Sequence, residues 1–192
     1  MPITLNGSGT VSGISVGGLP DGIIQSADIA SGVIPDGGKI LQVKQTVKKD
    51  QFSESVSSGS NSAVVTGLTV SITASSSSNK ILLIYQIVAN RQSNYVTIDK
   101  DGSVLTTAIG DASGGIGRVT AAGDYGNGVR YCNTIPIVFL DTPGDTNAHT
   151  YGVRLRHTSA STQTVYLNRE DSTNNATNST GISTVTAMEI AA

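Results

Sequence analysis

The chain has 192 residues and a formal net charge of −2, from 12 Lys and Arg and 14 Asp and Glu. Nucleic-acid binding needs a basic patch that neutralises phosphates, and the nearest approach to one is Lys44, Lys48 and Lys49, so we expect no nucleic-acid partner. Charged residues make up only 14% of the chain, against roughly 25% in typical globular proteins. Ser, Thr, Gly and Asn take their place, which favours turns and short strands over helices.

The sequence gives no indication of export or of membrane insertion. Cys132 is the single cysteine, so an internal disulfide cannot form. The opening residues Met1–Leu5 have neither the basic nor the apolar region of a signal peptide. The longest apolar run, Ile81–Tyr85, is much shorter than the roughly 20 residues that span a bilayer. We expect a protein that is made in a cytoplasm and does not insert into a membrane.

Residues 1–38 form a Gly-rich segment that differs from the rest. Pro-Asp-Gly occurs at 20–22 and again at 35–37 and predicts two turns, while 26–32 is compatible with one helical turn. A segment below about 40 residues rarely folds alone, so its apolar side chains must stay disordered, pack on the chain's own body or pack on another subunit. We favour other chains, and we interpret the segment as one for attachment and oligomerisation, through Ile3, Leu5, Val11, Ile14, Val16, Leu19, Ile23, Ile24, Ile29, Val33 and Ile34.

Residues 39–192 have the pattern of short strands separated by turns. We predict an antiparallel, all-β sandwich, jelly-roll-like and of about eight or nine strands, with strands at 39–47, 63–72, 80–88, 95–98, 104–109, 134–140, 150–156, 163–167 and 182–190. Asp101-Gly102 predicts a hairpin turn, and Pro136 belongs to an edge strand or a strand start. Residues 80–88 are apolar on both faces, which suits a central strand or one whose outer face meets a neighbouring subunit.

The residues that could form catalytic or metal sites lack partners at the spacing that such sites need. His149 and His157 lack a third ligand at suitable spacing, and a lone Cys132 is more often a small buried residue than a nucleophile. Gly13–Gly17 matches the nucleophile-elbow pattern, but a turn follows at Leu19–Gly22 where that motif needs a helix. We therefore predict no catalytic residues, no metal ligands and no cofactor, and we interpret the chain as not an enzyme.

Two polar loops have alternative interpretations. Asp99–Ser103 is faintly like a calcium loop, but its Gly falls at the wrong position and no bidentate Glu follows, so a hairpin is the better account. The second loop is a candidate surface-binding loop because binding sites favour loops on rigid scaffolds; a solvated connection is the alternative. Its candidate residues are Asn168, Arg169, Asp171, Asn174 and Asn175.

Several segments resemble virion structural proteins, the fibre-like proteins of marine tailed bacteriophages. The likeness lies in Ile3–Gly7, Gly18–Gly22, Ser26–Gly32, Gly38–Val43 and Thr184–Ala191. It implies a virion protein that forms a homotrimer, with an N-terminal attachment segment (1–38) and a C-terminal β knob (39–192). It carries over no catalytic residues.

These observations leave several functions open. The first is a short fibre or appendage whose knob contacts a host surface glycan or protein. The second is a capsid decoration protein, of the cement or head-fibre kind, because the long shaft of a tail fibre is missing between segment and knob. In both, the partners are further copies of the chain and other virion proteins. An independent carbohydrate-binding module explains the apolar leader less well, and an enzyme is the least favoured.

Overall fold

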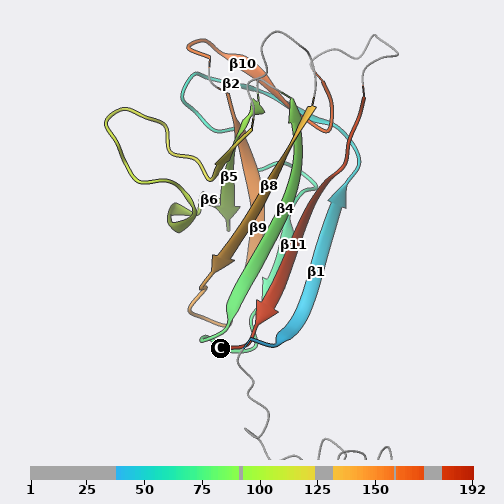
Figure 1. Cartoon of the computed structure of the whole chain (residues 1–192), viewed down its shortest axis with the longest axis vertical. Helices are drawn as coiled ribbons and strands as arrows, with labels where there is room; N and C mark the ends of the chain where they lie inside the picture. Colours follow the sequence, from blue (N-terminus) through green and yellow to red (C-terminus); the bar gives the residue numbers. More distant parts are fainter. Residues whose placement is uncertain (1–37, 91–92, 124–131, 158, 171–178) are drawn as a thin grey trace, which may run out of the picture. The chain divides into compact units, whose positions relative to one another are not determined.

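The computed structural model describes residues 38–90, 93–123, 132–157, 159–170 and 179–192. The part of the chain from Gly38 onwards belongs to one compact unit, a sandwich of two antiparallel sheets (Figure 1). The predicted all-β sandwich is thus confirmed.

The first sheet, sheet A, has β4 at its centre. β11 pairs with one edge of β4 and β1 pairs with β11, while β8 pairs with the opposite edge of β4 (Figure 1). Beyond the start of β11, β10 meets β4 at Ala89 and pairs in turn with β2. The strands are β1 (Ile40–Lys48), β2 (Phe52–Val56), β4 (Lys80–Asn90), β8 (Cys132–Asp141), β10 (Gln163–Leu167) and β11 (Ser183–Ile190).

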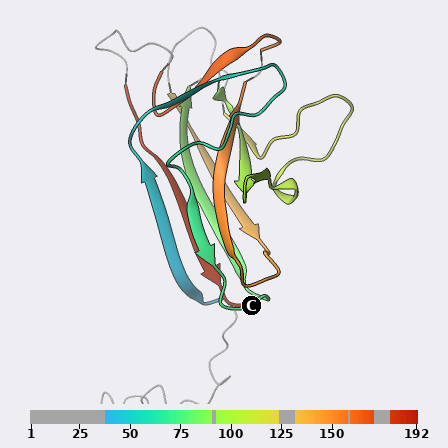
Figure 2. The same cartoon turned by 180° about the vertical axis from the view of Figure 1, so that it is seen from behind.

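The second sheet, sheet B, is built around β9, which pairs with β3 on one edge and β5 on the other (Figure 2). Two short strands, β6 and β7, both pair with β5, and a 3-10 helix, η3 (Thr106–Ala108), follows β6. The strands are β3 (Val70–Thr73), β5 (Tyr95–Lys100), β6 (Ser103–Val104), β7 (Ala121–Ala122) and β9 (Ala148–Arg156).

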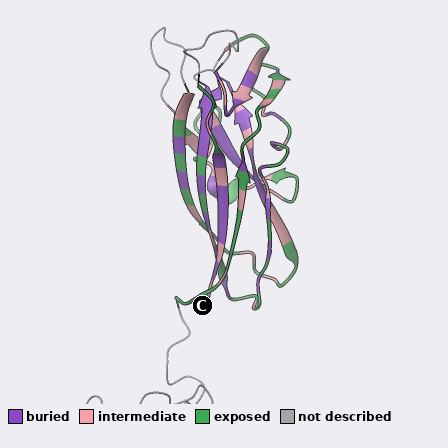
Figure 3. Ribbon diagram, turned by 90° about the vertical axis from the view of Figure 1, so that its right-hand side faces the viewer, coloured by how far each residue is buried: buried purple, intermediate pink, exposed green. Residues whose placement is uncertain are grey.

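The core lies between the two sheets and follows from strand periodicity. Successive side chains of a strand point to opposite faces, and buried and exposed residues alternate along the strands (Figure 3). On β9, Tyr151, Val153 and Leu155 are fully buried on one face. On β4, Leu83 and Tyr85 face them from the other sheet. Burying each such side chain stabilises the fold by about 1.5–3 kcal/mol.

Several predicted elements differ from those observed. The predicted strand at 63–72 is regular only from Val70, because the chain turns at Gly67, whose φ is +77°. Before that turn Val65 still donates its backbone N–H to Val153 O at 2.9 Å, so the segment runs irregularly beside β9. The predicted strand at 104–109 gives way to η3 after Val104.

Strand β2 was missed because Glu54 breaks its apolar alternation. Phe52, Glu54 and Val56 share one face of the strand, and both carboxylate oxygens of Glu54 accept the Ala63 N–H, at 3.0 and 3.1 Å. Other turn and edge predictions are confirmed. Asp101 and Gly102 both have positive φ, 55° and 83°, as a type I′ hairpin requires. Pro136 stands in β8, which pairs only with β4 within the described residues.

Candidate functional site

The structure describes only part of the residues singled out in the sequence. The eleven apolar residues from Ile3 to Ile34 lie outside the described residues, and so do Asp171, Asn174 and Asn175 of the candidate binding loop. Asn168 and Arg169 of that loop are described.

Asn168 is completely buried and its side chain is used inside the protein. Its amide nitrogen donates to the backbone oxygens of Lys48 and Asp50, at 2.8 and 3.0 Å, and its amide oxygen accepts from Ser183 Oγ at 2.7 Å. Its φ is +59°, a conformation that Asn tolerates better than most residues. Asn168 therefore ties the ends of β1, β10 and β11 together and does not face a surface ligand.

Arg169 lies across the ring of Tyr166, with its guanidinium carbon 4.8 Å from the ring centroid. Its Nε donates to the backbone oxygen of Glu170 at 2.8 Å, and its backbone bridges to Thr180. Cation–π contacts of this kind hold a side chain in place. The described part of the loop is therefore organised by its own contacts.

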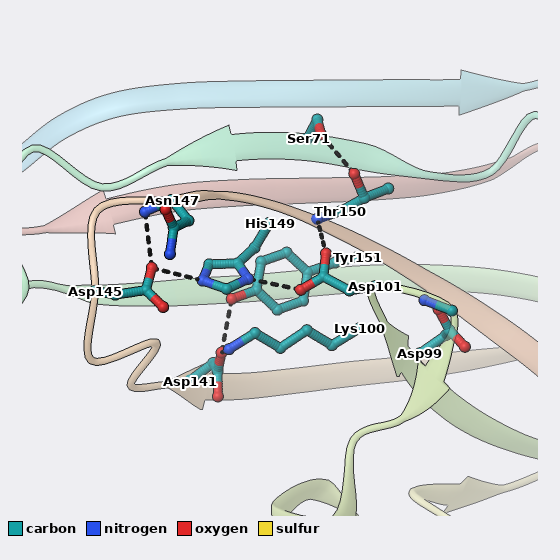
Figure 4. A network of polar contacts seen from close by, with 11 residues as sticks. Ser71, Asp99, Lys100, Asp101, Asp141, Asp145, Asn147, His149, Thr150 and Tyr151 are labelled. Atoms are coloured by element: carbon teal, nitrogen blue, oxygen red, sulfur yellow. Dashed lines mark hydrogen bonds and ion pairs between the residues drawn. The ribbon is translucent and has the colours of Figure 1, made fainter.

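A polar network joins two turns to strand β9 at one end of sheet B (Figure 4). The two ring nitrogens of His149 each contact a carboxylate, Asp101 Oδ2 at 2.6 Å and Asp145 Oδ1 at 3.0 Å. Burial raises the pKa of Asp101, but hydrogen bonds from His149 and the Thr150 N–H outweigh it and leave this pKa lowered. The pKa of Asp145 is lowered too, and the main cause is the hydrogen bond from the Asn147 N–H. Because both ring nitrogens are engaged, His149 clamps the turns together.

Next to this clamp, Asp141 receives two donors between the sheets. Tyr151 Oη donates to Asp141 Oδ2 at 2.6 Å, and Lys100 Nζ lies 2.9 Å from the same oxygen (Figure 4). Burial first, and then the bond to Asp141, raises the pKa of Tyr151 above its usual range. A neutral phenol donating to a carboxylate beside a lysine is a structural arrangement, and it fixes the end of β8 to β5 and β9.

A second buried carboxylate, Glu189 on β11, accepts four hydrogen bonds from described residues. Its side chain is 1% exposed. One oxygen accepts from Gln42 Nε2 at 2.6 Å, and the other accepts from Ser75 N, Ser75 Oγ and Asn79 Nδ2 at 2.6, 2.6 and 2.7 Å. These donors come from β1 and from the connection between β3 and β4. Glu189 thus joins sheet A to the chain that crosses over from sheet B.

We expect this carboxylate to make the fold sensitive to acid. Burial raises the pKa of Glu189, but the hydrogen bonds from Ser75, Gln42 and Asn79 prevail and lower it from 4.5 to about 2. Between those values the unfolded chain binds more protons, so the contribution is complete above about pH 4.5 and is lost as pH falls towards 2. Urea unfolding at pH 6.0, 4.5, 3.5 and 2.5 measures it. The pKa values of Asp101 and Asp145 are lowered as well, so these groups also make stability depend on pH. The Glu189→Gln variant keeps their contribution and is therefore the reference. If its free energy of unfolding fell with pH as steeply as that of the wild type, Glu189 would not be the source of the effect.

The remaining reactive groups have structural partners as well. His157 is buried; its Nε2 donates to Val56 O at 2.8 Å and its Nδ1 accepts from the Ser159 N–H at 3.1 Å. Burial, followed by the negative charge of Glu170, raises the pKa of Cys132 to about 11, which disfavours the reactive thiolate. No three His, Cys, Asp or Glu side chains within the described ranges are grouped so as to hold a metal ion. Nor is any helix among them long and apolar enough to cross a membrane.

The most unusual surface of the described unit is the outer face of sheet A, which we call the apolar face. Nine large apolar side chains are exposed among the described residues, and the strand register places six of them on this face; the other three are Leu41, at the register shift of β1, Ile116 and Ile182. Val43 is 55% exposed, Val138 69% and Leu140 47%. The apolar face comprises Ile40, Val43, Val47, Leu82, Ile84, Val138, Leu140, Met188 and Ile190.

Strand register aligns these residues in rows across four strands. The pairings of β1 with β11, β11 with β4 and β4 with β8 give three successive rows on the outer face. The first row is entirely apolar, and none of the three contains Asp, Glu, Lys or Arg. The rows are Val43–Met188–Leu82–Leu140, then Gln45–Thr186–Ile84–Val138, then Val47–Thr184–Gln86–Pro136.

The sequence contained a partial signal of this face. The apolar run in β4 predicted a central strand or an outer face that meets a neighbouring subunit, and β4 is indeed central. Its outer residue Ile84 remains 36% exposed in the single chain. The neighbours on β1, β8 and β11 were missed, because alternation along one strand does not tell which strands lie beside it.

Comparison with known proteins adds no family to this description. No protein-family model matches the chain, and no curated protein is similar to it.

Proposed function

We propose that this chain is a non-enzymatic structural subunit of a virion, a short appendage that is anchored by its N-terminal segment and ends in the β-sandwich. The observation that carries the proposal is the apolar face. Large contiguous apolar patches on a protein surface mark sites of interaction, and here the patch covers a four-stranded surface whose three central rows contain no charge, with Lys80 beside Ile190 at its end. A self-associating structural protein uses such a surface, and the resemblance to fibre-like proteins of marine tailed bacteriophages supplies the context of a virion.

A capsid decoration protein is the second candidate, and one structural feature favours it. The sandwich starts immediately after residue 38: Gly38 N–H donates to Ala191 O at 2.8 Å, and Ala191 N–H donates to Lys39 O at 2.9 Å. The entry to β1 and the end of the chain are therefore tied together at the same edge of sheet A. A knob that begins directly after its anchor suits a low decoration on a capsid better than a fibre that reaches for a receptor.

Deletion of residues 1–37 tests the anchoring role. We expect the truncated protein to keep its β-type circular dichroism and its thermal midpoint, because the sandwich from Gly38 onwards is a compact unit. Particles assembled without the natural chain are supplied with full-length or truncated protein, purified and analysed by immunoblot. Only the full-length protein should be incorporated. Equal incorporation of the truncated protein would rule out the anchoring role, and labelling of intact particles then places the protein on the capsid or on the tail.

A further inference from the structure

We propose that the apolar face is covered by the apolar face of a second copy of this chain, related by a two-fold axis that lies between the two faces and runs parallel to their strands. This inference rests on the proposed structural role and names the partner of the same surface. It concerns the sandwich itself and requires nothing of residues 1–37.

The size of the face fits a subunit interface. Strands lie about 4.8 Å apart and rise about 3.3 Å per residue, so four strands of seven residues, from the row of Ile190 to that of Val47, cover about 450 Å² in projection. Side chains protrude from a pleated sheet, so the accessible area is larger than the projection. Specific interfaces begin at about 600 Å² on each partner, and the face with its protruding side chains comes close to that value.

The chemistry of the face is complementary to itself. A charged face meeting its own copy would place like charges together, whereas the three rows named above contain no charged residue, and Lys80 stands at their end in the row of Ile190. The polar groups that lie on it are partly satisfied within the chain, since Gln45 Nε2 donates to Thr186 Oγ1 at 2.9 Å. Desolvation of these two side chains by a second copy therefore leaves their hydrogen bond intact, and the first row has no side-chain hydrogen bonds to lose.

The two-fold axis brings each row of one copy onto the same row of the other, in reverse order. Rotation about an axis parallel to the strands keeps their direction and reverses their order, so β1 lies over β8 of the other copy and β11 over β4. The first row then meets its own reverse: Val43 lies against Leu140 of the partner subunit and Met188 against Leu82 of the partner subunit. A self-complementary contact of this kind closes with two subunits, so the face favours a pair over the trimer implied by the phage resemblance.

Val138→Lys in the full-length protein tests the interface. Val138 is 69% exposed and lies on an edge strand, where Lys is well tolerated, so the single chain should fold normally. In the pair each copy buries one unpaired lysine, and we expect the dissociation constant to rise about 100-fold or more. Val138→Thr keeps the shape, and Ile116→Lys adds the same charge at a 73% exposed position outside the face; both should associate more strongly than Val138→Lys, with Ile116→Lys equal to the wild type.

Sedimentation over about 1–100 µM measures the outcome. A wild-type dimer that Val138→Lys dissociates supports the proposal. A wild-type monomer throughout this range overturns it, as does an oligomer that all variants form equally, since the face is then covered by some other partner or by none.

A charge-exchange experiment keeps the arrangement testable if Val138→Lys fails to fold. Val43→Glu alone and Leu140→Lys alone each bury unpaired charges in the pair and should be monomers. Their equimolar mixture should dimerise, because one contact becomes Glu–Lys and the other stays apolar. Two folded variants that do not associate on mixing overturn the two-fold arrangement.

The interface and the virion role can fail separately. Association of purified protein without incorporation into particles would reject the virion role alone, whereas incorporation of a protein that is monomeric in solution would reject the interface alone.

Discussion

Replacing Glu189 with glutamine is expected to lower the free energy of unfolding by about 2–3 kcal/mol, because hydrogen bonds to a charged acceptor contribute about 1.5–3 kcal/mol each and several weaken together. The carboxylate accepts from Gln42 on one oxygen and from Ser75 and Asn79 on the other. An amide offers one oxygen, which must remain with Ser75 and Asn79. Its NH₂ group then faces Gln42 Nε2, and Gln42 relieves that clash only by giving up its bond to Thr73 O.

Thermal unfolding at pH 7 measures the effect, and a loss of this size lowers the midpoint by about 5–10 °C in a domain of this length. Glu54→Gln is the matched control, because that carboxylate receives only the Ala63 N–H, at a site open to solvent. It should leave the midpoint close to that of the wild type. Equal effects of the two substitutions would mean that Glu189 contributes no more than a surface carboxylate.

The all-β architecture could be predicted from the sequence because the alternation of buried and exposed residues is a property of each strand by itself. Tyr151, Val153 and Leu155 alternate with Arg154 and its neighbours, and the structure buries the apolar set between the sheets. The hairpin at Asp101-Gly102 could be predicted for the same reason, since a two-residue turn depends on the φ values of its own residues. Where a side chain is recruited by a residue outside its own strand, as Glu54 is by Ala63 nine residues later, the pattern within the strand was misleading.

The candidate surface was much less accessible, because it depends on which strands are neighbours. Val43, Met188, Leu82 and Leu140 are far apart in the chain and become one row only through three strand pairings. Read individually, each is one apolar residue of a half-buried strand. Glu189 posed the reverse problem. Its position in the closing strand places it on the buried face with Val185 and Ala187. Its donors, however, come from Gln42, Ser75 and Asn79, more than 100 residues away in the chain.

Removing the Asp141 carboxylate, as Asp141→Ala, is expected to cost about 3 kcal/mol of unfolding free energy. Two groups lose their acceptor at once: the Tyr151 hydroxyl, on a completely buried residue, and the Lys100 ammonium, whose side chain is 18% exposed. A buried donor without a partner costs about 1–3 kcal/mol, and breaking a buried ion pair from one side costs about 3–5 kcal/mol. The partial exposure of Lys100 lets its stem bend towards water, which lowers the ion-pair cost to about 1–2 kcal/mol and brings the total to about 3 kcal/mol.

Two further variants separate these contributions in urea unfolding at pH 7. Tyr151→Phe removes only the hydroxyl, leaves Lys100 paired with Asp141, and should cost about 1 kcal/mol. Asp145→Ala removes a carboxylate of the neighbouring His149 clamp whose side chain is 43% exposed, and should change the midpoint far less than Asp141→Ala. If Asp141→Ala were as mild as Asp145→Ala, the end of β8 would be held by apolar packing and not by its polar contacts. Because β8 contributes Val138 and Leu140 to the apolar face, a loosened β8 should also weaken self-association, even though Asp141 points into the core.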